Sequence, residues 1–365
     1  MVRRRLLLAA LPGVAHALPD DDDTVRAGRV LRWPRDHGAH PGARNEWWYA
    51  TGWFDMPAAA PIGFQITFFR HRTGLAAALP SRFAPRQLLF AHAALSDVGA
   101  GSHLQAQRTQ RWSGDEQAGD AHAMRSDTDV QLGRWSLRRE SSAGTADRYR
   151  ARVGGADAPF GLQLDLLATQ PVLLQGVAGF SRKGPLPQQA SHYYSLPHLR
   201  VQALLERDGK RTSLQGSAWL DHEWSDEYLP PEAVGWDWIG FNLDDGGALM
   251  AFRLRRADGS GFWGGGSHRG ADGKSRSFAP DELRFTPQRW WTSAASQARY
   301  PVQWLVETPA GRFTVRALMD AQELDGRMSN GALYWEGLSD LLDDGGRRVG
   351  RGYLEMTGYG KRLAM

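Results

Sequence analysis

Short strand-like runs separated by turn residues are the feature that most constrains the fold of this chain. Residues 47–54 and 64–69 are rich in aromatic and β-branched side chains, and turn signals such as residues 207–210 (RDGK) separate runs of this kind. The chain has 42 glycines and 19 prolines, and few stretches repeat apolar residues at the three- and four-residue spacing of a helix. We therefore expect an all-β fold, with a short helix opening at residues 279–283. Further strands are expected at residues 87–95, 214–220, 249–254, 302–306, 313–318 and 352–359.

Length and an internal echo predict two domains. Once residues 1–17 are set aside as a targeting segment, 348 of the 365 residues remain, more than one hydrophobic core usually organises. Tryptophan-rich runs at residues 47–53 and 236–241 each open a comparable series of strands. Because Pro230 and Pro231 interrupt strand pairing, the two β-domains, barrels or sandwiches, are expected to join near residues 220–235.

The N-terminus has the pattern of a secretory signal peptide. Arginines at residues 3–5 precede an apolar run at residues 6–14, and residues 15–17 (AHA) provide a cleavage site. This pattern predicts export to the periplasm, by the general or the twin-arginine route, with removal of residues 1–17. The acidic segment 18–27 that follows is expected to be disordered.

Composition excludes several classes of function. The chain has no cysteine, which rules out disulfides, thiol chemistry and cysteine lipidation. Loss of the three signal arginines lowers the formal charge from +4 to +1, and the other basic clusters are pairs such as Arg255-Arg256. Nucleic acid is therefore not an expected partner. No later apolar run approaches the ~20 residues that a membrane helix needs.

Fifteen tryptophans, several of them beside carboxylates, indicate an apolar ligand. One cluster covers residues 45–49 (NEWWY), and a second runs from Trp219 through residues 221–224 (DHEW) to residues 236–238 (WDW). Aromatic walls hold apolar molecules and raise the pKa of a carboxyl group placed among them. Most of the fifteen are nevertheless expected to fill β-sheet cores, since large aromatics commonly do so.

The tetrad Asp221-His222-Glu223-Trp224 contains the best candidates for acid chemistry. In a strand, Asp221 and Glu223 face one side together with Trp219, whereas His222 and Trp224 face the other side. A carboxyl group held against indoles, or the His222 imidazole, can donate a proton near neutral pH. The alternative is a structural Asp221–His222 pair that fastens the two β-domains together.

The other two clusters follow the same alternation. Within residues 45–49, Glu46 and Trp48 are expected to face a barrel interior while the remaining aromatics face the opposite side. Glu46 then either belongs to a site or bonds to backbone or an arginine at a plugged barrel end. Within residues 236–238, both tryptophans are expected on one face and Asp237 on the other, an arrangement more typical of a core than of a ligand cage.

No metal or cofactor is expected. His37 and His40, and Asp221 with His222, offer ligand atoms, but the chain contains no HExxH or comparable spaced set. It also contains no G-x-S-x-G motif of a serine hydrolase. The glycines at residues 264–266 lack the GK[ST] ending and the following helix of a phosphate-binding loop.

Aromatic motifs distributed over nearly the whole mature chain carry a family resemblance. They are residues 45–52 (NEWWYATG), 91–97 (AHAALSD), 193–195 (YYS), 216–224 (GSAWLDHEW), 235–238 (GWDW), 334–337 (YWEG) and 352–359 (GYLEMTGY). With these motifs the chain resembles the lipocalin-like family that includes AttH-like exported proteins and carotenoid 1,2-hydratase (hydroxyneurosporene synthase). The resemblance implies two lipocalin-like antiparallel β-barrel domains packed together, here residues 28–224 and 225–365. It also implies an apolar ligand, an isoprenoid or lipid, in or between the barrels.

The resemblance also implies roles for individual residues. In the hydratases, water adds across a terminal isoprenoid double bond without a redox cofactor, and their His-x-Trp motif matches residues 222–224 (HEW). The tyrosine that accompanies their downstream aspartate has no counterpart beside Asp237. We therefore expect Asp221 or His222 as the acid, Trp224 as a wall for the cation and Asp237 as the base that orients water. The ligand-binding residues expected beside them are Glu46, Trp47, Trp48, Tyr49, His92, Tyr194, Trp219, Trp236 and Trp238.

Two other readings stay open at this point. One is a non-catalytic lipid carrier or cell-envelope factor that works with an ABC-type export transporter and contacts a membrane or that transporter peripherally. The other is a purely structural two-barrel protein. The sequence names neither the ligand nor the oligomeric state.

Overall fold

The computed structural model describes residues 23–362, apart from residues 76–80, 82, 83, 118, 142, 143, 228 and 330. The signal peptide expected at residues 1–17 lies outside the described residues. The acidic segment 18–27 is described only from Asp23 on, and there the structure differs from the expectation of disorder. Asp23 is buried, and its carboxylate accepts hydrogen bonds from Arg35 Nη2 (2.8 Å) and the Gly42 backbone N–H (2.7 Å). An ion pair with Arg35 and a hydrogen bond to the Gly42 backbone therefore hold this end of the segment against the residues that precede the first strand.

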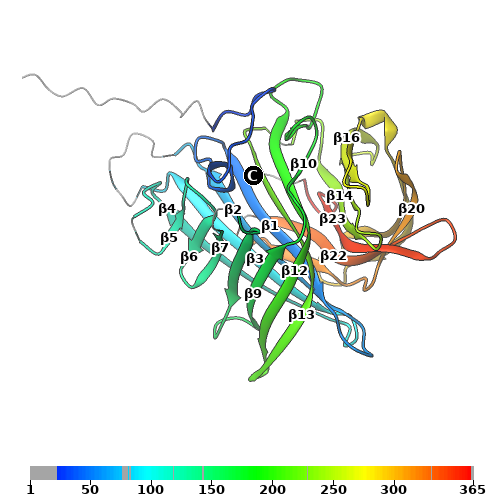
Figure 1. The fold of residues 1–365 in the computed structure, drawn as a ribbon, viewed down its shortest axis with the longest axis horizontal. Coiled ribbons are helices and arrows are strands. Elements are labelled where there is room, and N and C mark those ends of the chain that lie inside the picture. Colours follow the sequence, from blue (N-terminus) through cyan, green and yellow to red (C-terminus); the bar gives the residue numbers. More distant parts are fainter. Residues whose placement is uncertain are drawn as a thin grey trace, which may run out of the picture.

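Within the described residues, the first sheet contains thirteen antiparallel strands. They are β1 (Asn45–Phe54), β2 (Ile62–Arg72), β3 (Gln87–Asp97), β4 (Ser102–Trp112), β5 (Ala121–Ala123), β6 (Asp129–Leu132), β7 (Trp135–Glu140), β8 (Arg148–Gly154), β9 (Gly161–Ala168), β10 (Leu173–Leu174), β11 (Phe180–Arg182), β12 (Ala190–Arg207) and β13 (Lys210–Ser225). Their order is β4-β3-β2-β1-β13-β12-β9-β8-β7-β6-β5, with β10 and β11 paired to β12. Because β4 also lies against β5 and β6, the sheet curls into a nearly closed barrel (Figure 1).

The second sheet contains ten strands in the same described part of the chain. They are β14 (Gly235–Leu243), β15 (Ala248–Arg255), β16 (Gly261–Arg269), β17 (Ser275–Phe278), β18 (Arg284–Thr292), β19 (Arg299–Thr308), β20 (Gly311–Ala317), β21 (Glu323–Gly326), β22 (Ala332–Leu342) and β23 (Arg348–Thr357). Their order is β17-β16-β15-β14-β23-β22-β20-β19-β18, with β21 paired to β22. The first sheet ends at Ser225 and the second begins at Gly235, so the connecting segment contains the two prolines at residues 230 and 231.

Each sheet packs around its own apolar core, and a third apolar cluster joins the two sheets. Trp135 and Trp224 belong to the first core, and Trp304 and Trp335 belong to the second. The third cluster combines side chains of β1, β12 and β13 with side chains of β14, β15 and β23. Figure 1 shows β1, β12 and β13 of the first sheet next to β14 and β23 of the second sheet. This junction contains the cavity described below.

The predicted fold class is confirmed. Every strand expected from the sequence overlaps an observed strand, and the helix expected at residues 279–283 is a single 3₁₀ turn, η3 (Pro280–Glu282). A second 3₁₀ turn, η2 (Arg35–His37), precedes β1. In the described part of the chain, no helix has the length and apolar character to cross a membrane.

Candidate active site between the two sheets

A cavity of about 90 Å³ lies at the junction of the two sheets. Aromatic rings form most of its wall, and four carboxyl groups and one ammonium group face it. Its lining residues are Trp47, Tyr49, Thr67, Phe69, Lys183, Tyr193, Asp221, Glu223, Trp236, Trp238, Phe252, Leu254, Ala332, Tyr334, Glu336, Glu355 and Thr357. Carboxyl groups enclosed by aromatic rings are the combination that acid chemistry on an apolar ligand requires.

Strand alternation explains how the first sheet contributes to this cavity. β1 and β13 pair antiparallel, with Trp47 opposite Glu223 and Tyr49 opposite Asp221. Directly opposed residues point to the same face of a sheet, so these four side chains all reach the cavity. The intervening residues of both strands point to the other face, into the first barrel.

The second sheet contributes by the same rule. Glu336 on β22 lies opposite Glu355 on β23, and Glu355 lies opposite Trp238 on β14. All three side chains therefore share one face, which turns toward the first sheet. Trp236 joins them from two residues earlier on β14 and donates a hydrogen bond from its Nε1 to Glu355 Oε1 (3.1 Å).

Asp221 is held by three donors. Its Oδ1 accepts hydrogen bonds from Trp219 Nε1 (2.7 Å) and Ser195 Oγ (2.5 Å), and its Oδ2 accepts one from the Tyr193 hydroxyl (2.8 Å). Burial raises the pKa of Asp221 to about 7, and the three hydrogen bonds oppose that rise. Near neutral pH this carboxyl group therefore exists both as an acid and as a conjugate base that is already solvated by protein donors.

Glu336 and Glu355 form a second acidic unit. Burial, reinforced by the charge of Glu355, raises the pKa of Glu336 well above its usual value. Burial also raises the pKa of Glu355 to about 8, against the hydrogen bond from Trp236. Two buried carboxyl groups on directly opposed residues cannot both ionise cheaply, so the pair retains a proton at neutral pH.

One cation faces the same cavity. Lys183, in the loop after β11, places Nζ 2.9 Å from Glu223 Oε1 and 4.1 Å from the ring centre of Phe252. The Ser191 hydroxyl also donates to Glu223 Oε1. Lys183 and Glu223 therefore neutralise one another, which leaves Asp221 and the glutamate pair as the acids available to a ligand.

The four residues expected to act together in catalysis are not brought together. Asp221 lines the cavity, whereas His222 and Trp224 point into the first barrel because they alternate with it along β13. Asp237 points into the second sheet, where it pairs with Arg253 (2.7 Å) and Arg255 (3.2 Å). The expected roles of Trp224 as cation wall and Asp237 as base in one site with Asp221 were therefore wrong.

The nine expected ligand-binding residues divide between the cavity and other places. Trp47, Tyr49, Trp236 and Trp238 line the cavity. Trp219 does not line the cavity, but its indole N–H donates a hydrogen bond to Asp221. The other four do not line it: Glu46, Trp48 and Tyr194 belong to the interior of the first barrel, and His92 lies beside the cavity, bonded to one of its lining residues.

His92 links the sheets and does not contact the cavity directly. Its Nδ1 is 2.7 Å from the Tyr334 hydroxyl and its Nε2 is 2.6 Å from Ser329 Oγ. Burial lowers the pKa of His92 to about 3, which makes the imidazole a poor general base for Ser329 at neutral pH. These two hydrogen bonds are therefore structural, and they fix the cavity residue Tyr334 against β3.

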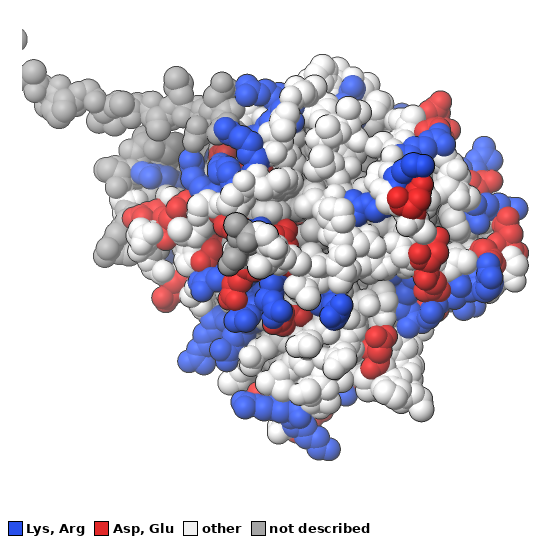
Figure 2. Space-filling model, in the orientation of Figure 1, with Lys and Arg blue, Asp and Glu red and all other residues white. Residues whose placement is uncertain are grey.

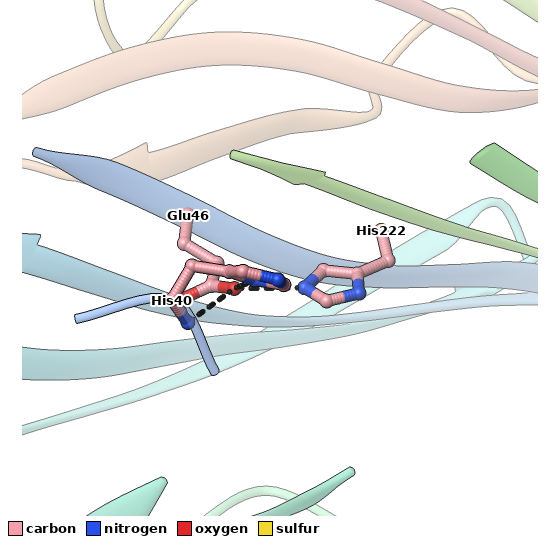
Figure 3. Close-up of side chains that lie close together, drawn as sticks. All are labelled: His40, Glu46 and His222. Carbon is pink, nitrogen blue, oxygen red and sulfur yellow. Dashed lines mark hydrogen bonds and ion pairs between the residues drawn. The ribbon is translucent and has the colours of Figure 1, made fainter. Parts of the chain in front are cut away.

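A buried polar network occupies the interior of the first barrel (Figure 3). Glu46 Oε1 accepts hydrogen bonds from His40 Nδ1 (2.8 Å) and His222 Nε2 (2.9 Å), and Glu46 Oε2 accepts one from Arg70 Nε (2.7 Å). Burial raises the pKa of Glu46, but Arg70 and the two histidines outweigh it and hold the pKa well below the usual value. Burial lowers the pKa of His222 to about 4, so its Nδ1 is free to accept a hydrogen bond from the Tyr194 hydroxyl (3.1 Å).

Tryptophan rings enclose this network. Trp48 stacks on His222 with ring centres 4.7 Å apart, and Trp224 stacks on His40 at 3.7 Å. The second ring nitrogen of His40 lies 3.1 Å from Asp36 Oδ1, so carboxylates flank both of its nitrogens. Glu46, His222 and Trp224 thus lie in the interior of the first barrel and not in the cavity, and Glu46 bonds to an arginine, which is one of the two alternatives left open for it.

The same three side chains have the donor types of a metal site. Ligand atoms of His40, Glu46 and His222 lie within 4.8 Å of one another, and imidazole with carboxylate suits zinc. Both oxygens of Glu46, however, already accept hydrogen bonds, one of them from the Arg70 guanidinium. A metal ion would have to break these bonds and lie near a buried positive charge, so the charge balance favours the hydrogen-bonded network.

Sequence reasoning missed several residues of the cavity. Glu336 and Glu355 were noticed only as parts of motifs, and Lys183 and Tyr193 received no role. Each glutamate alternates with aromatic residues in an otherwise apolar strand (YWEG, GYLEM), and a buried acid in such a strand is a signal that could have identified it. The sequence contained no comparable signal for Lys183.

Fold and site together define a lipocalin-like all-β protein with an acidic, aromatic-walled cavity between two antiparallel sheets. The sequence profile of the AttH-like family matches residues 24–359, and the chain belongs to that family. A crystal structure of an AttH homologue from Nitrosomonas europaea is 47% identical, with a TM-score of 0.83 over 92% of this chain and 99% of that one. Kievitone hydratase from Nectria haematococca shares the fold at 15% identity, with a TM-score of 0.67 over 93% of this chain and 95% of that one. A comparison with functionally curated proteins found no match.

Proposed function

We propose that this protein is a cofactor-free hydratase that adds water to a carbon–carbon double bond of an apolar, isoprenoid-type ligand held between the two sheets. One observation carries the proposal. Asp221 is a fully buried acid in an aromatic-walled cavity, and its pKa of about 7 lets it donate a proton near neutrality. Kievitone hydratase, a structural neighbour with the same fold, is named as a hydratase, which supports the same chemistry.

The reaction needs no oxidant or reductant. Asp221 transfers its proton to one alkene carbon, and a new C–H bond forms as the carboxyl O–H bond breaks. The tertiary carbocation left on the other carbon is stabilised by the faces of Trp47, Trp236 and Trp238. Water attacks this carbon and returns one proton to the Asp221 carboxylate, so the net change is the addition of H and OH.

The surroundings of Asp221 suit its conjugate base. The Tyr193 hydroxyl, the Ser195 hydroxyl and the Trp219 indole N–H all point at the carboxylate oxygens before any proton leaves. Donors that are already oriented toward a developing charge need no reorganisation during the reaction. Tyr193 is itself held by Trp238 Nε1 (3.1 Å), so a hydrogen-bond chain connects the second sheet to the acid in the first.

The experiment measures whether the hydroxyl oxygen of the product alcohol comes from water. The purified protein is incubated in ¹⁸O-labelled water with geraniol and with squalene, and the organic extract is analysed by mass spectrometry. We expect a tertiary alcohol carrying ¹⁸O with the wild type and none with Asp221→Asn. Asp340→Asn is the matched control, because Asp340 is a buried acid on β22 that does not line the cavity and pairs with Arg351.

The cavity also fits a carrier that binds its ligand without changing it, because apolar rings dominate the wall. A lipid that copurifies with the protein, together with the absence of labelled product from either probe, would favour that function and reject the hydratase. On either function we propose a periplasmic location, from the signal peptide pattern at residues 1–17. Contact with an export transporter is proposed only for the case in which the protein is a carrier.

We propose no nucleic acid partner for this protein. Figure 2 shows basic and acidic side chains interspersed on the visible face, with a largely uncharged centre. Nucleic acid binding instead relies on a continuous basic face.

A further inference from the structure

Glu336 and Glu355 form a carboxyl pair to which the proposed hydration chemistry assigns no role. They are directly opposed on β22 and β23, and both line the cavity. The Asp221 carboxyl group, assigned above as the acid, belongs to the other sheet. The pair is therefore available for recognition of the ligand.

Two buried polar atoms beside this pair have no hydrogen bond of standard geometry. They are Glu336 Oε1 and the hydroxyl oxygen of Tyr49 on β1, and these two groups interact with one another without reaching standard hydrogen-bond geometry. Both residues line the cavity and are at least 95% buried, with exposed fractions of 3% and 5%. Buried polar atoms that lack a well-formed hydrogen bond are costly, so these two atoms mark a place where a polar group of a ligand can complete the bonding.

The charges around the cavity define the sign of that group. Four carboxyl groups line the cavity, and the single ammonium group among the lining residues, Lys183, is engaged by Glu223. Asp221 and Glu223 add to the negative field at Glu355. A positively charged group relieves the repulsion within this set, whereas a carboxylate would add to it.

The rings around the pair suit a cation. Trp236 bonds to Glu355 through its indole N–H. Burial raises the pKa values of Tyr49 and Tyr334, and the charges of the two glutamates raise them further. A cage of aromatic faces with a carboxylate at one side is an arrangement that recognises ammonium groups. The rest of the cavity wall is apolar, which suits a hydrocarbon body.

We propose that the Glu336–Glu355 pair binds the protonated amine of a ligand whose remaining body is apolar. The ammonium group donates to Glu336 Oε1 and lies against the rings of Tyr49, Tyr334 and Trp236. The inference rests on the proposed function for the place of the ligand, but it does not depend on turnover. It narrows the ligand class from any isoprenoid or lipid to an amine-bearing one.

The test compares three probes with one hydrocarbon body and different head groups. Isothermal titration calorimetry at pH 7 measures the binding of N,N-dimethylgeranylamine, geraniol and geranic acid to the full chain. We expect the amine to bind about ten-fold or more tightly than the alcohol, and the acid to bind most weakly. Because the pair holds a proton when empty, we also expect up to about one proton to be released per amine bound, seen as a dependence on the ionisation enthalpy of the buffer.

Variants locate the effect. Glu336→Gln keeps the shape of the side chain and removes its charge, so the preference for the amine over the alcohol should fall to near unity while geraniol still binds. Asp340→Asn, four residues further along β22 and on the same face, should leave the preference unchanged. Circular dichroism and thermal unfolding of each variant show that the comparison is made on folded protein.

The outcomes separate this inference from the hydratase proposal. Equal affinity for the amine and the alcohol in the wild type, or a preference that survives Glu336→Gln, overturns the amine site whatever the labelling experiment gives. Amine selectivity without ¹⁸O incorporation leaves the amine site standing and removes only the hydratase. Tighter binding of geranic acid than of the amine would reverse the inferred charge of the ligand.

Discussion

Asp221 and His222 are adjacent in the chain but belong to different environments, because β13 turns one toward the cavity and the other into the first barrel. Asp221 is bonded to Trp219, Ser195 and Tyr193, whereas His222 is bonded to Glu46 and Tyr194. The two side chains can therefore be changed independently.

Replacing Asp221 should abolish the hydration reaction in a protein that still folds. Asp221→Asn removes the proton that the alkene needs, so the rate of ¹⁸O incorporation should fall about 100-fold or more. The new amide group faces three donors, which should lower the free energy of unfolding by about 1–3 kcal/mol. Chemical denaturation and the labelling assay measure the two effects, and wild-type turnover by this variant would remove Asp221 from the mechanism.

Replacing Asp237 should have the opposite profile. Asp237→Asn leaves Arg255 buried beside a neutral group, which should lower the free energy of unfolding by about 3–5 kcal/mol. Because the side chain points away from the cavity, ligand affinity per folded molecule should be unchanged. Calorimetric titration below the unfolding temperature checks this, and a large loss of affinity would restore the role expected from the sequence.

The free energy of unfolding should fall as the pH rises through the pKa values of the carboxyl groups that line the cavity. Glu355 has a folded pKa of about 8, above its ordinary value of 4.5, so the folded state binds the proton more tightly than the unfolded state does. Its contribution to stability is complete below about pH 4.5 and is lost as the pH approaches and passes 8. Glu355→Gln should therefore flatten the decrease in unfolding free energy between pH 5 and pH 8.

Denaturant unfolding at several pH values measures that slope. The comparison must be made as variant minus wild type, because Glu46, whose pKa is lowered, has the opposite effect at acid pH. An unchanged slope in Glu355→Gln would show that Glu355 does not hold a proton in the folded protein.

The Glu46 network should be essential for stability alone. Glu46→Gln removes the negative charge between Arg70, His40 and His222, which should lower the free energy of unfolding by about 3 kcal/mol. The cavity lies on the other face of β1, so affinity for the cavity ligand should change less than two-fold when the variant is folded. If the loss of binding only matches the loss of folded protein, the result agrees with this assignment.

Removal of metal ions should leave the protein unaffected. The ligand-type atoms of His40, Glu46 and His222 are already saturated by hydrogen bonds. Dialysis against a chelator should therefore leave the thermal unfolding midpoint unchanged, and added zinc should not raise it. A rise on zinc addition that disappears in His40→Gln would identify a metal centre in the first barrel.

The sequence predicted much of the fold and part of the arrangement of the site. Glycine-punctuated strand runs indicated the all-β class, and alternation assigned Asp221 with Trp219 to one face and His222 with Trp224 to the other. The structure agrees with both assignments. The error was to place residues from both faces in one site, because the resemblance to hydratases grouped them by their closeness in the chain.

Which faces meet was decided by tertiary structure alone. A period of two follows from local backbone geometry, so it can be read from any strand in isolation. The cavity depends instead on packing a face of β1, β12 and β13 against a face of β14, β22 and β23, which brings together Tyr49 and Glu336, 287 positions apart in the chain. No local pattern specifies such a contact, since it results from burying two apolar faces against one another. The sequence by itself thus determined the strands and the facing of their side chains, while tertiary packing decided that the glutamate pair, Asp221 and the tryptophans share one cavity.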